Sequence, residues 1–279
     1  MGTDARTAFV LGGGGRLGAA EVGMLAALIG SGIRPDLVLG TSIGAINGVA
    51  IADSPHAGGV DRLRQLWVDV DRSGVFGGRL VDRVRHIATT RTSLHSNEPL
   101  RRLLERTLDG RQIEDLEVPY QCVAACIETA EATWFDRGPA VDAVLASCAV
   151  PGLLPAVRIG ERHFLDGGVV DSIPVRRALE LGATRIFVLQ VGRIEQPLEV
   201  PRRPHEVALV AFEIARRHSF ATAMVSRPEG VDVHVLPTGS DPVRFNDLRQ
   251  MRYGDFSDVP GRIARAEVAS RAYLDELES

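Results

Sequence analysis

The feature that most constrains this chain is the segment Gly40-Thr41-Ser42-Ile43-Gly44, in which a serine stands between two glycines. The apolar run Leu37–Leu39 precedes the serine turn, and the small-residue stretch 45–52 follows it. This order predicts a buried strand, a sharp turn that carries Ser42, and a helix. Such a turn lifts the serine hydroxyl off the end of a sheet and places it near a helix N-terminus, where negative charge is stabilised.

Two other glycine-bearing segments stand at comparable places in the chain. Residues 12–18, Gly-Gly-Gly-Gly-Arg-Leu-Gly, follow the apolar run 8–11 and precede a helix-like stretch at 19–31. Asp166-Gly167-Gly168 follows a strand-like run and places a carboxylate on a tight turn. A serine hydroxyl becomes a nucleophile only when one group takes its proton and others hold the oxyanion that forms. Together the three segments indicate a nucleophile, an oxyanion hole and a base.

The composition is that of an ordinary globular protein, and it excludes some classes of function. The chain has 279 residues, of which 45% are hydrophobic and 24% charged, enough for one large core or two small ones. Its net charge of −4 leaves no basic excess to neutralise phosphates, so we expect no nucleic-acid partner. We also expect no metal and no cofactor, because the sequence has no cluster with metal-ligand spacing and no acidic loop of the calcium-binding type.

The sequence predicts a cytoplasmic protein. Three cysteines, Cys122, Cys126 and Cys148, are too few for a disulfide framework, and the first two flank apolar residues typical of a buried strand. We find no signal peptide and no run of about 18 uncharged apolar residues. The basic stretch from Arg72 to Arg106 predicts a solvated helical face; the alternative is a lid or a surface for anionic headgroups, which would make the protein peripheral at a membrane. The sequence does not indicate an oligomeric state.

Strand-like and helix-like segments alternate along most of the chain. This order implies a three-layer α/β/α fold with a mainly parallel central sheet that is covered on both faces. We expect a single domain over residues 1–279: a motif-bearing core at about 8–191, and a C-terminal segment at about 205–277 that packs on it because it has too little strand for its own sheet. Strands are expected at 8–11, 37–39, 120–127, 133–135, 157–164, 185–191 and 231–236, and helices at 19–31, 45–52, 60–108 with breaks at Gly74, Gly77-Gly78 and Pro99, 141–148, 174–181, 205–226 and 260–277.

The glycine run also fits a dinucleotide-binding fingerprint, because Gly13, Gly15 and Gly18 have the spacing G-x-G-x-x-G. That fold needs an acidic residue at the end of its second strand to hold a ribose. Here the nearest acid, Asp36, precedes the second strand, and the Ser42 turn occupies the place of the ribose. The sequence therefore favours the nucleophile over the dinucleotide.

The ordinary base for such a serine is a histidine on a late loop. His205 and His218 lie in helical patterns and His234 lies in a strand-like alternation, so none of the three has that setting. His163 precedes Asp166 on what is predicted to be one strand, and we interpret it as a structural residue. Asp166 is the better candidate for the base, and a Ser-His-Asp esterase that uses one of the late histidines is the alternative.

The three ordered blocks resemble those of the patatin-like phospholipases, a family of serine acyl hydrolases, over most of residues 8–191. The family shows G-G-G-x-R-G, then G-x-S-x-G, then D-G-G or D-G-A, and it works with a Ser-Asp dyad and no histidine. The stretches 146–152 and 165–175 also look like the family. The resemblance implies that Ser42 is the nucleophile and Asp166 its base, and that a lipid or another acyl ester is hydrolysed through an acyl-enzyme. It assigns the oxyanion hole to Gly13, Gly14, Gly15 and Arg16.

One position departs from the family pattern. In register with the family block, Arg16 stands at the variable position and Leu17 stands where the arginine normally is. The backbone donors depend on the glycines and survive this change, whereas any role of the arginine side chain passes to Arg16 or is lost. The departure favours a third interpretation, a non-catalytic module that binds a lipid or a partner in the same pocket.

Overall fold

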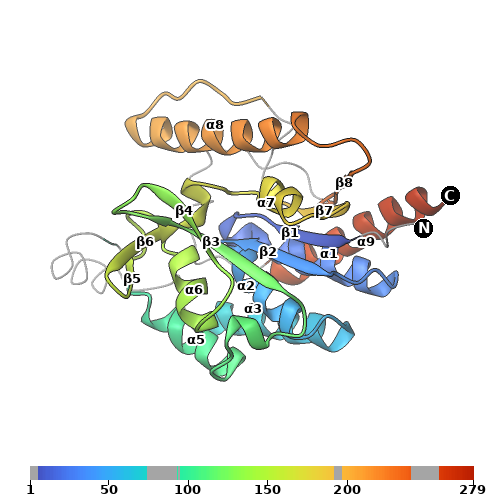
Figure 1. Ribbon diagram of the computed structural model, residues 1–279, viewed down its shortest axis with the longest axis horizontal. Coiled ribbons are helices and arrows are strands. Elements are labelled where there is room, and N and C mark those ends of the chain that lie inside the picture. The colour runs from blue at the N-terminus through green and yellow to red at the C-terminus, as the bar shows by residue number, and fades with distance from the viewer. Residues whose placement is uncertain (1–5, 74–92, 94, 192–196, 240–257) are drawn as a thin grey trace.

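The structure is a computed structural model that describes residues 6–73, 93, 95–191, 197–239 and 258–279 (Figure 1). In these residues a central sheet lies between two layers of helices, which confirms the predicted α/β class. One layer consists of α1 (Ala19–Gly30), α2 (Ile43–Asp53), α3 (Ala57–Ser73), α5 (Glu98–Leu108), α6 (Ala140–Ser147) and α9 (Val259–Glu278). The other consists of α7 (Val175–Glu180) and α8 (Pro204–Val225).

The central strands are buried on both faces. In β1 (Thr7–Leu11), Phe9 and Leu11 belong to the larger core beneath α1 and α2, whereas Ala8 and Val10 belong to the smaller core beneath α7 and α8. A strand covered on both faces is expected to be apolar throughout rather than alternating, which is what the sequence of this segment shows.

The sheet is mixed and mainly parallel. Its described strands run in the order β5-β6-β3-β2-β1-β7-β8, and β4 pairs with β3 off this path. From β3 to β8 all neighbours are parallel, whereas β4, β5 and β6 pair antiparallel. The further strands are β2 (Leu37–Thr41), β3 (Tyr120–Cys126), β4 (Glu131–Phe135), β5 (Val157–Ile159), β6 (Arg162–Asp166), β7 (Arg185–Leu189) and β8 (Asp232–Val235).

Strands β2 and β6 lie end to end along one side of β3. Thr41, the last residue of β2, is the partner of Val123, and Asp166, the last residue of β6, is the partner of Ala124. The other side of β3 is occupied by β4 over the same residues. Because β2 is parallel to β3 and β6 is antiparallel to it, the carboxyl ends of β2 and β6 face each other. The residue after Thr41 therefore comes next to Asp166.

One of the expected elements needs correction. Residues 157–164 were expected to form one strand, but they contain the turn of the β5–β6 hairpin, because the chain reverses at Gly160 in the left-handed conformation with φ of 61°. The expected helix break at Pro99 agrees with the structure, since residues 95–97 are not helical and Pro99 lies in the first turn of α5, where a missing N–H costs no helical hydrogen bond. The other expected breaks, Gly74 and Gly77-Gly78, lie outside the described residues.

The C-terminal helix α9 packs closely against α1. A Cβ atom at Gly23 of α1 would lie 2.2 Å from the carbonyl oxygen of Ile263, so a glycine is needed for the two backbones to approach this closely. Ile263 and Leu274 of α9 are buried in the same core as α1. Helix α9 therefore packs on the motif-bearing core. The single domain over 1–279, with its C-terminal segment at about 205–277, stays a prediction.

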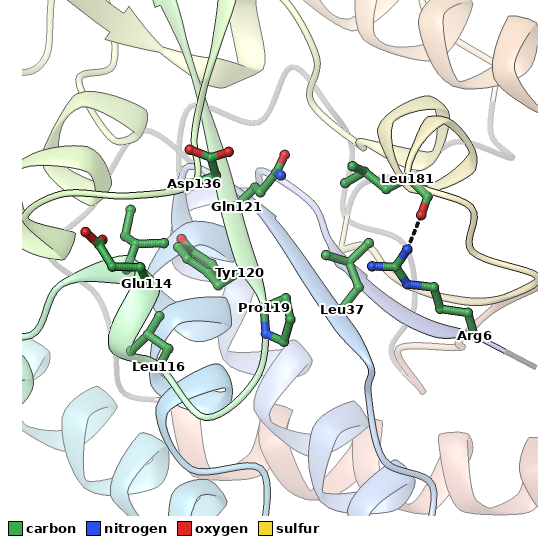
Figure 2. Close-up of a pocket in the computed structure, with 10 residues that line it drawn as sticks. Arg6, Leu37, Glu114, Leu116, Pro119, Tyr120, Gln121, Asp136 and Leu181 are labelled. Carbon is green, nitrogen blue, oxygen red and sulfur yellow. Dashed lines mark hydrogen bonds between the residues drawn. The ribbon is translucent and has the colours of Figure 1, made fainter.

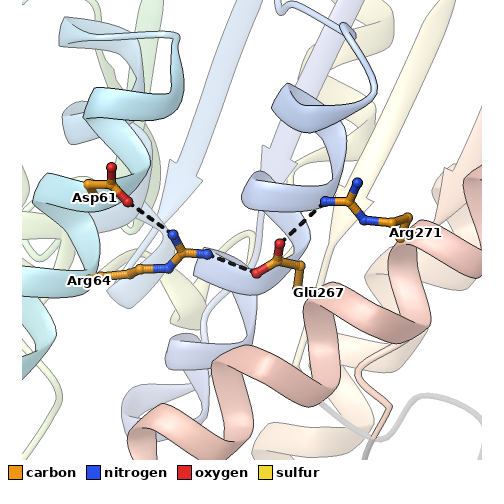
Figure 3. A network of polar contacts seen from close by, with 4 residues as sticks. All are labelled: Asp61, Arg64, Glu267 and Arg271. Carbon is orange, nitrogen blue, oxygen red and sulfur yellow. Dashed lines mark hydrogen bonds and ion pairs between the residues drawn. The ribbon is translucent and has the colours of Figure 1, made fainter.

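Charged residues on the outer surface also connect α9 to its neighbours (Figure 3). Arg64 of α3 pairs with Asp61 at 3.0 Å and with Glu267 of α9 at 2.8 Å. Arg271 pairs with the second oxygen of Glu267 at 3.3 Å. Most of the basic stretch from Arg72 to Arg106 lies outside the described residues.

Candidate active site

Ser42 stands on a strained turn between β2 and α2. Its φ of 55° and ψ of −122° are rare for a residue with a side chain, and such strain is concentrated at functional sites. A Cβ atom at Gly40 would lie 2.5 Å from the Gly44 carbonyl oxygen, and one at Gly44 would lie 2.4 Å from that of Leu11. Both distances are too short for a carbon atom. The two glycines of the motif therefore let α2 start directly over the ends of β2 and β1.

The side chains of Ser42 and Asp166 meet at the junction of β2 and β6. The Ser42 hydroxyl donates a hydrogen bond of 2.6 Å to Oδ2 of Asp166. The other oxygen, Oδ1, accepts the N–H of Gly168 at 2.7 Å, which fixes the carboxylate on its turn. Ser42 is 9% exposed and Asp166 is 5% exposed, so the pair is almost shielded from water.

Burial changes the chemistry of this carboxylate. It raises the pKa of Asp166 from its ordinary value of 3.8 to about 6, against the opposing effect of the hydrogen bonds from Ser42 and Gly168. A carboxylate with a raised pKa is a stronger base than a solvated one and is still mainly ionised at neutral pH. The pair can therefore move a proton from the serine to the carboxylate.

The glycine loop runs beside Ser42. A Cβ atom at Gly13 would lie 3.6 Å from the Cβ of Ser42. The N–H of Gly13 donates to the carbonyl of Ser172 at 2.9 Å, so in this structure it is not a free donor. Within the described residues the N–H groups of Gly14 and Gly15 make no hydrogen bond, which leaves them available to a ligand.

Arg16 and Leu17 continue the loop as a short 3-10 helix, Gly15–Gly18. Leu17 packs against the larger core, and its N–H closes the turn onto the Gly14 carbonyl at 3.2 Å. The residue at the family's arginine position is thus an apolar anchor. The charge of Arg16 lies near Arg262 of α9, where it helps to lower the pKa of that guanidinium after the larger effect of burial.

The segment that follows Asp166 is hydrogen-bonded to both the glycine loop and the strand before the Ser42 turn. Thr41 donates its hydroxyl to the Asp171 carbonyl at 2.9 Å, and Ser172 accepts the N–H of Gly13. Burial raises the pKa of the Asp171 side chain to about 6, with Arg176 acting in the opposite direction. Residues 166–172 therefore supply both the carboxylate and two backbone contacts that hold the other motifs in place.

A buried polar network, which the sequence analysis did not predict, contacts the end of the glycine loop at Gly18. Asn47 of α2 donates to the Gly18 carbonyl at 3.0 Å and to Oε2 of Glu21 at 2.8 Å, and it accepts from the Trp67 indole at 3.0 Å. Glu21 is fully buried, and burial raises its pKa well above the ordinary value, which favours the neutral form. The signal was present, since Glu21 is the one charged residue of the apolar helix α1.

Among the described side chains, none of the histidines is hydrogen-bonded to Ser42 or Asp166. The imidazole of His163 pairs with Glu128 at 2.7 Å, and that of His234 stacks on Phe187. His218 lies on α8, and the side chain of His205 is outside the described residues.

A pocket of about 260 Å³ opens at the opposite end of the sheet (Figure 2). Leu37 and Tyr120, the first residues of β2 and β3, line it together with Arg6, whose guanidinium reaches the Leu181 carbonyl. Ser42 follows the other end of β2, so this pocket is separate from the dyad. The described residues contain no group of three metal-ligand side chains and no helix that could span a membrane.

A serine on a strand-turn-helix elbow with a buried carboxylate partner is the arrangement of a serine hydrolase site. A comparison with protein-family models matches residues 9–179 to the patatin-like phospholipases. This match covers more than half of the chain, and the chain belongs to that family, as the resemblance of its motifs predicted.

Individual relatives agree with this assignment. Patatin-like phospholipase domain-containing protein ZK370.4 of Caenorhabditis elegans is 34% identical over 189 residues, which are 67% of this chain and 14% of that protein. Lysophospholipase nte1 of Aspergillus oryzae is 32% identical over 189 residues, 67% of this chain and 12% of that protein. The chain thus spans a small part of the length of these relatives.

Among solved structures, VipD from Legionella pneumophila has a TM-score of 0.49 and 14% identity, over 98% of this chain and 67% of VipD.

Proposed function

We propose that this chain is a serine acyl hydrolase that cleaves carboxylic esters of lipids through Ser42 and Asp166. The observation that carries the proposal is the buried hydrogen bond of 2.6 Å between Ser42 Oγ and Asp166 Oδ2. It joins two residues that lie 124 positions apart and within the region matched to the patatin-like phospholipases.

In the first half of the reaction, Asp166 takes the Ser42 proton while Oγ attacks the ester carbonyl carbon. The oxyanion that forms is held by the N–H groups of Gly14, Gly15 and Arg16, each worth about 3 kcal/mol in such sites, and by the N-terminus of α2. The carbonyl re-forms, the carbon–oxygen bond to the alcohol breaks, and Asp166 gives its proton to the departing alcohol. The products are an acyl-enzyme on Ser42 and the free alcohol.

In the second half, water replaces the alcohol. Asp166 takes a proton from the water, whose oxygen attacks the acyl carbon, and the same N–H groups hold the second oxyanion. The bond to Ser42 Oγ breaks, the proton passes from Asp166 to the serine, and a fatty acid leaves. Each proton transfer to Asp166 needs the raised pKa of this carboxyl, because an ordinary carboxylate is too weak a base toward a serine hydroxyl.

The test is hydrolysis of p-nitrophenyl esters of increasing acyl length by the wild type, Ser42→Ala and Asp166→Asn. We expect both variants to lose turnover while they keep the fold, as measured by circular dichroism. An Asp166→Asn variant that still turns over the esters would refute the dyad. Since one relative is named a lysophospholipase, lysophosphatidylcholine and phosphatidylcholine are the lipids to assay next, by fatty-acid release.

Two alternatives have their own tests. A Ser-His-Asp esterase predicts that one of His205→Ala, His218→Ala or His234→Ala abolishes hydrolysis. A binding module, favoured by Leu17 at the arginine position, predicts that a fluorophosphonate probe leaves Ser42 unlabelled. The cytoplasmic location and peripheral contact with a membrane stay predictions from the sequence.

A further inference from the structure

We infer that three consecutive residues at the C-terminal end of α6, Ser147-Cys148-Ala149, are positioning residues that hold Ser42 and Asp166 in reacting geometry. The inference rests on the proposed function, since it concerns the same dyad. We name this segment the α6 clamp. Its three contacts reach the backbone of both dyad residues, and although the segment lies within the family-like stretch 146–152, the sequence alone did not predict these contacts.

Two contacts of the α6 clamp hold the peptide groups of the nucleophile. The Ser42 N–H donates to the Ser147 hydroxyl oxygen at 2.9 Å. The Cys148 thiol donates to the Ser42 carbonyl at 3.1 Å, a carbonyl that also accepts the N–H of Ala45 at 2.8 Å. The strained φ of Ser42 is thus fixed from both sides, by an acceptor for its N–H and a donor for its carbonyl.

The third contact holds the base. The N–H of Asp166 donates to the Ala149 carbonyl at 2.9 Å. Ser42 follows the last residue of β2, and Asp166 is the last residue of β6. These two strands pair with β3 and not with each other, so the separation of the dyad residues depends on what both of them contact. The α6 clamp touches both, and it does so through adjacent residues whose own spacing is set by covalent geometry.

The α6 clamp is buried and internally bonded. Ser147 is 0% exposed, Cys148 5% and Ala149 1%. The N–H of Cys148 bonds to the Val144 carbonyl at 3.0 Å, and that of Ala149 bonds to the Ala146 carbonyl at 3.3 Å. Burial and the charge of Asp166 raise the pKa of the Cys148 thiol well above its ordinary value, so the thiol keeps the proton that it donates.

The test compares variants that remove a contact with variants that restore it. Ser147→Ala and Cys148→Ala each remove one buried hydrogen bond, and we expect each to lower kcat by about ten- to a hundredfold with little change in KM. Ser147→Thr keeps a hydroxyl acceptor, and Cys148→Ser keeps a donor, so both should recover most of the loss. The controls are Cys122→Ala, which removes a fully buried thiol from β3, and Ser270→Ala on α9, whose hydroxyl bonds to the Pro237 carbonyl.

Unfolding temperatures and the rate of Ser42 labelling by a fluorophosphonate accompany the kinetics. The inference is overturned if Ser147→Ala and Cys148→Ala keep kcat within about twofold of the wild type, or if the controls lose as much at equal stability. A loss that Ser147→Thr and Cys148→Ser do not recover would also overturn it.

Failure of the proposed function has a different signature, because the wild type itself would then neither hydrolyse esters nor react with the fluorophosphonate. The α6 clamp can still be tested in that case by hydrogen exchange at the Ser42 amide. We expect Ser147→Ala to speed this exchange about tenfold or more, while Ser270→Ala leaves it unchanged. Equal exchange in the wild type and Ser147→Ala would count against the clamp whether or not the protein is an enzyme.

Discussion

Replacing Asp166 by asparagine separates the effect of the buried carboxylate on stability from its proposed role as a base. The pKa of this carboxyl is 3.8 in its ordinary state and about 6 in the fold. One pKa unit corresponds to about 1.4 kcal/mol, so ionised Asp166 lowers the free energy of unfolding by about 3 kcal/mol relative to the protonated form. The variant Asp166→Asn keeps an oxygen that can accept the Gly168 N–H, and it carries no charge.

The direction of the pH dependence follows from the raised pKa. Protonation of Asp166 stabilises the fold fully below the unfolded pKa near 4, and this contribution is lost as the pH rises through about 6. Asparagine does not titrate in this range. The stability of Asp166→Asn relative to the wild type should therefore grow by about 2 to 3 kcal/mol between pH 4 and pH 8, even though we expect the variant to lose ester hydrolysis.

Urea unfolding of the two proteins at intervals between pH 4 and pH 8 measures this difference. Groups common to both, including buried Asp171, cancel in the comparison. Glu161→Gln, which removes an exposed carboxyl in the β5–β6 turn, is the control for replacing a carboxyl by an amide as such. A stability difference between Asp166→Asn and the wild type that does not change with pH would refute the reasoning, because it would mean that folding leaves this pKa unperturbed.

Three further predictions concern the same parts of the molecule. The kcat/KM for ester hydrolysis should fall about tenfold per pH unit below about 6, and a profile flat down to pH 4 would contradict Asp166 as the base. Gly44→Ala should lower kcat/KM by about tenfold or more and slow fluorophosphonate labelling, because its Cβ would meet the Leu11 carbonyl. Gly23→Ala should lower the free energy of unfolding by about 1 to 3 kcal/mol, measured in urea, since α9 leaves no room for its Cβ. Gly30→Ala in the same helix meets only the flexible end of Arg271, and equal losses in the two variants would exclude close packing as the cause.

The sequence was most informative where structure is local. The elbow around Ser42 was predictable because an apolar strand, a turn with two glycines and a small-residue helix follow one another within about 15 residues. Burial of Cys122 and Cys126 was likewise predicted from the apolar residues between them, and both are buried in the larger core. The helices α8 and α9 were also found within a residue or two of their ends, since both are long and bounded by prolines or charged residues.

The sequence was least informative where distant segments meet. The contact between Ser42 and Ser147 joins positions 105 residues apart, and neither residue type at its own place signals the other. The reversal at Gly160 was missed because the apolar residues Val157, Ile159 and Phe164 were assigned to one strand across the glycine. The pairing of β6 with β3 then depends on that reversal, so the head-to-head meeting of β2 and β6 could not be predicted from either strand alone.

That meeting of two strands has a consequence for how the protein acquires activity. The elbow of Ser42 can form early, from contacts along residues 7–53, but its carboxylate partner arrives only when β6 has docked beside β3. Contacts of such long sequence separation close slowly, because the chain entropy is lost before the contact is gained. On the proposed mechanism, a chain emerging from the ribosome therefore carries Ser42 without its base until well over half of the chain has been synthesised, and hydrolysis can begin only when β6 has docked on β3.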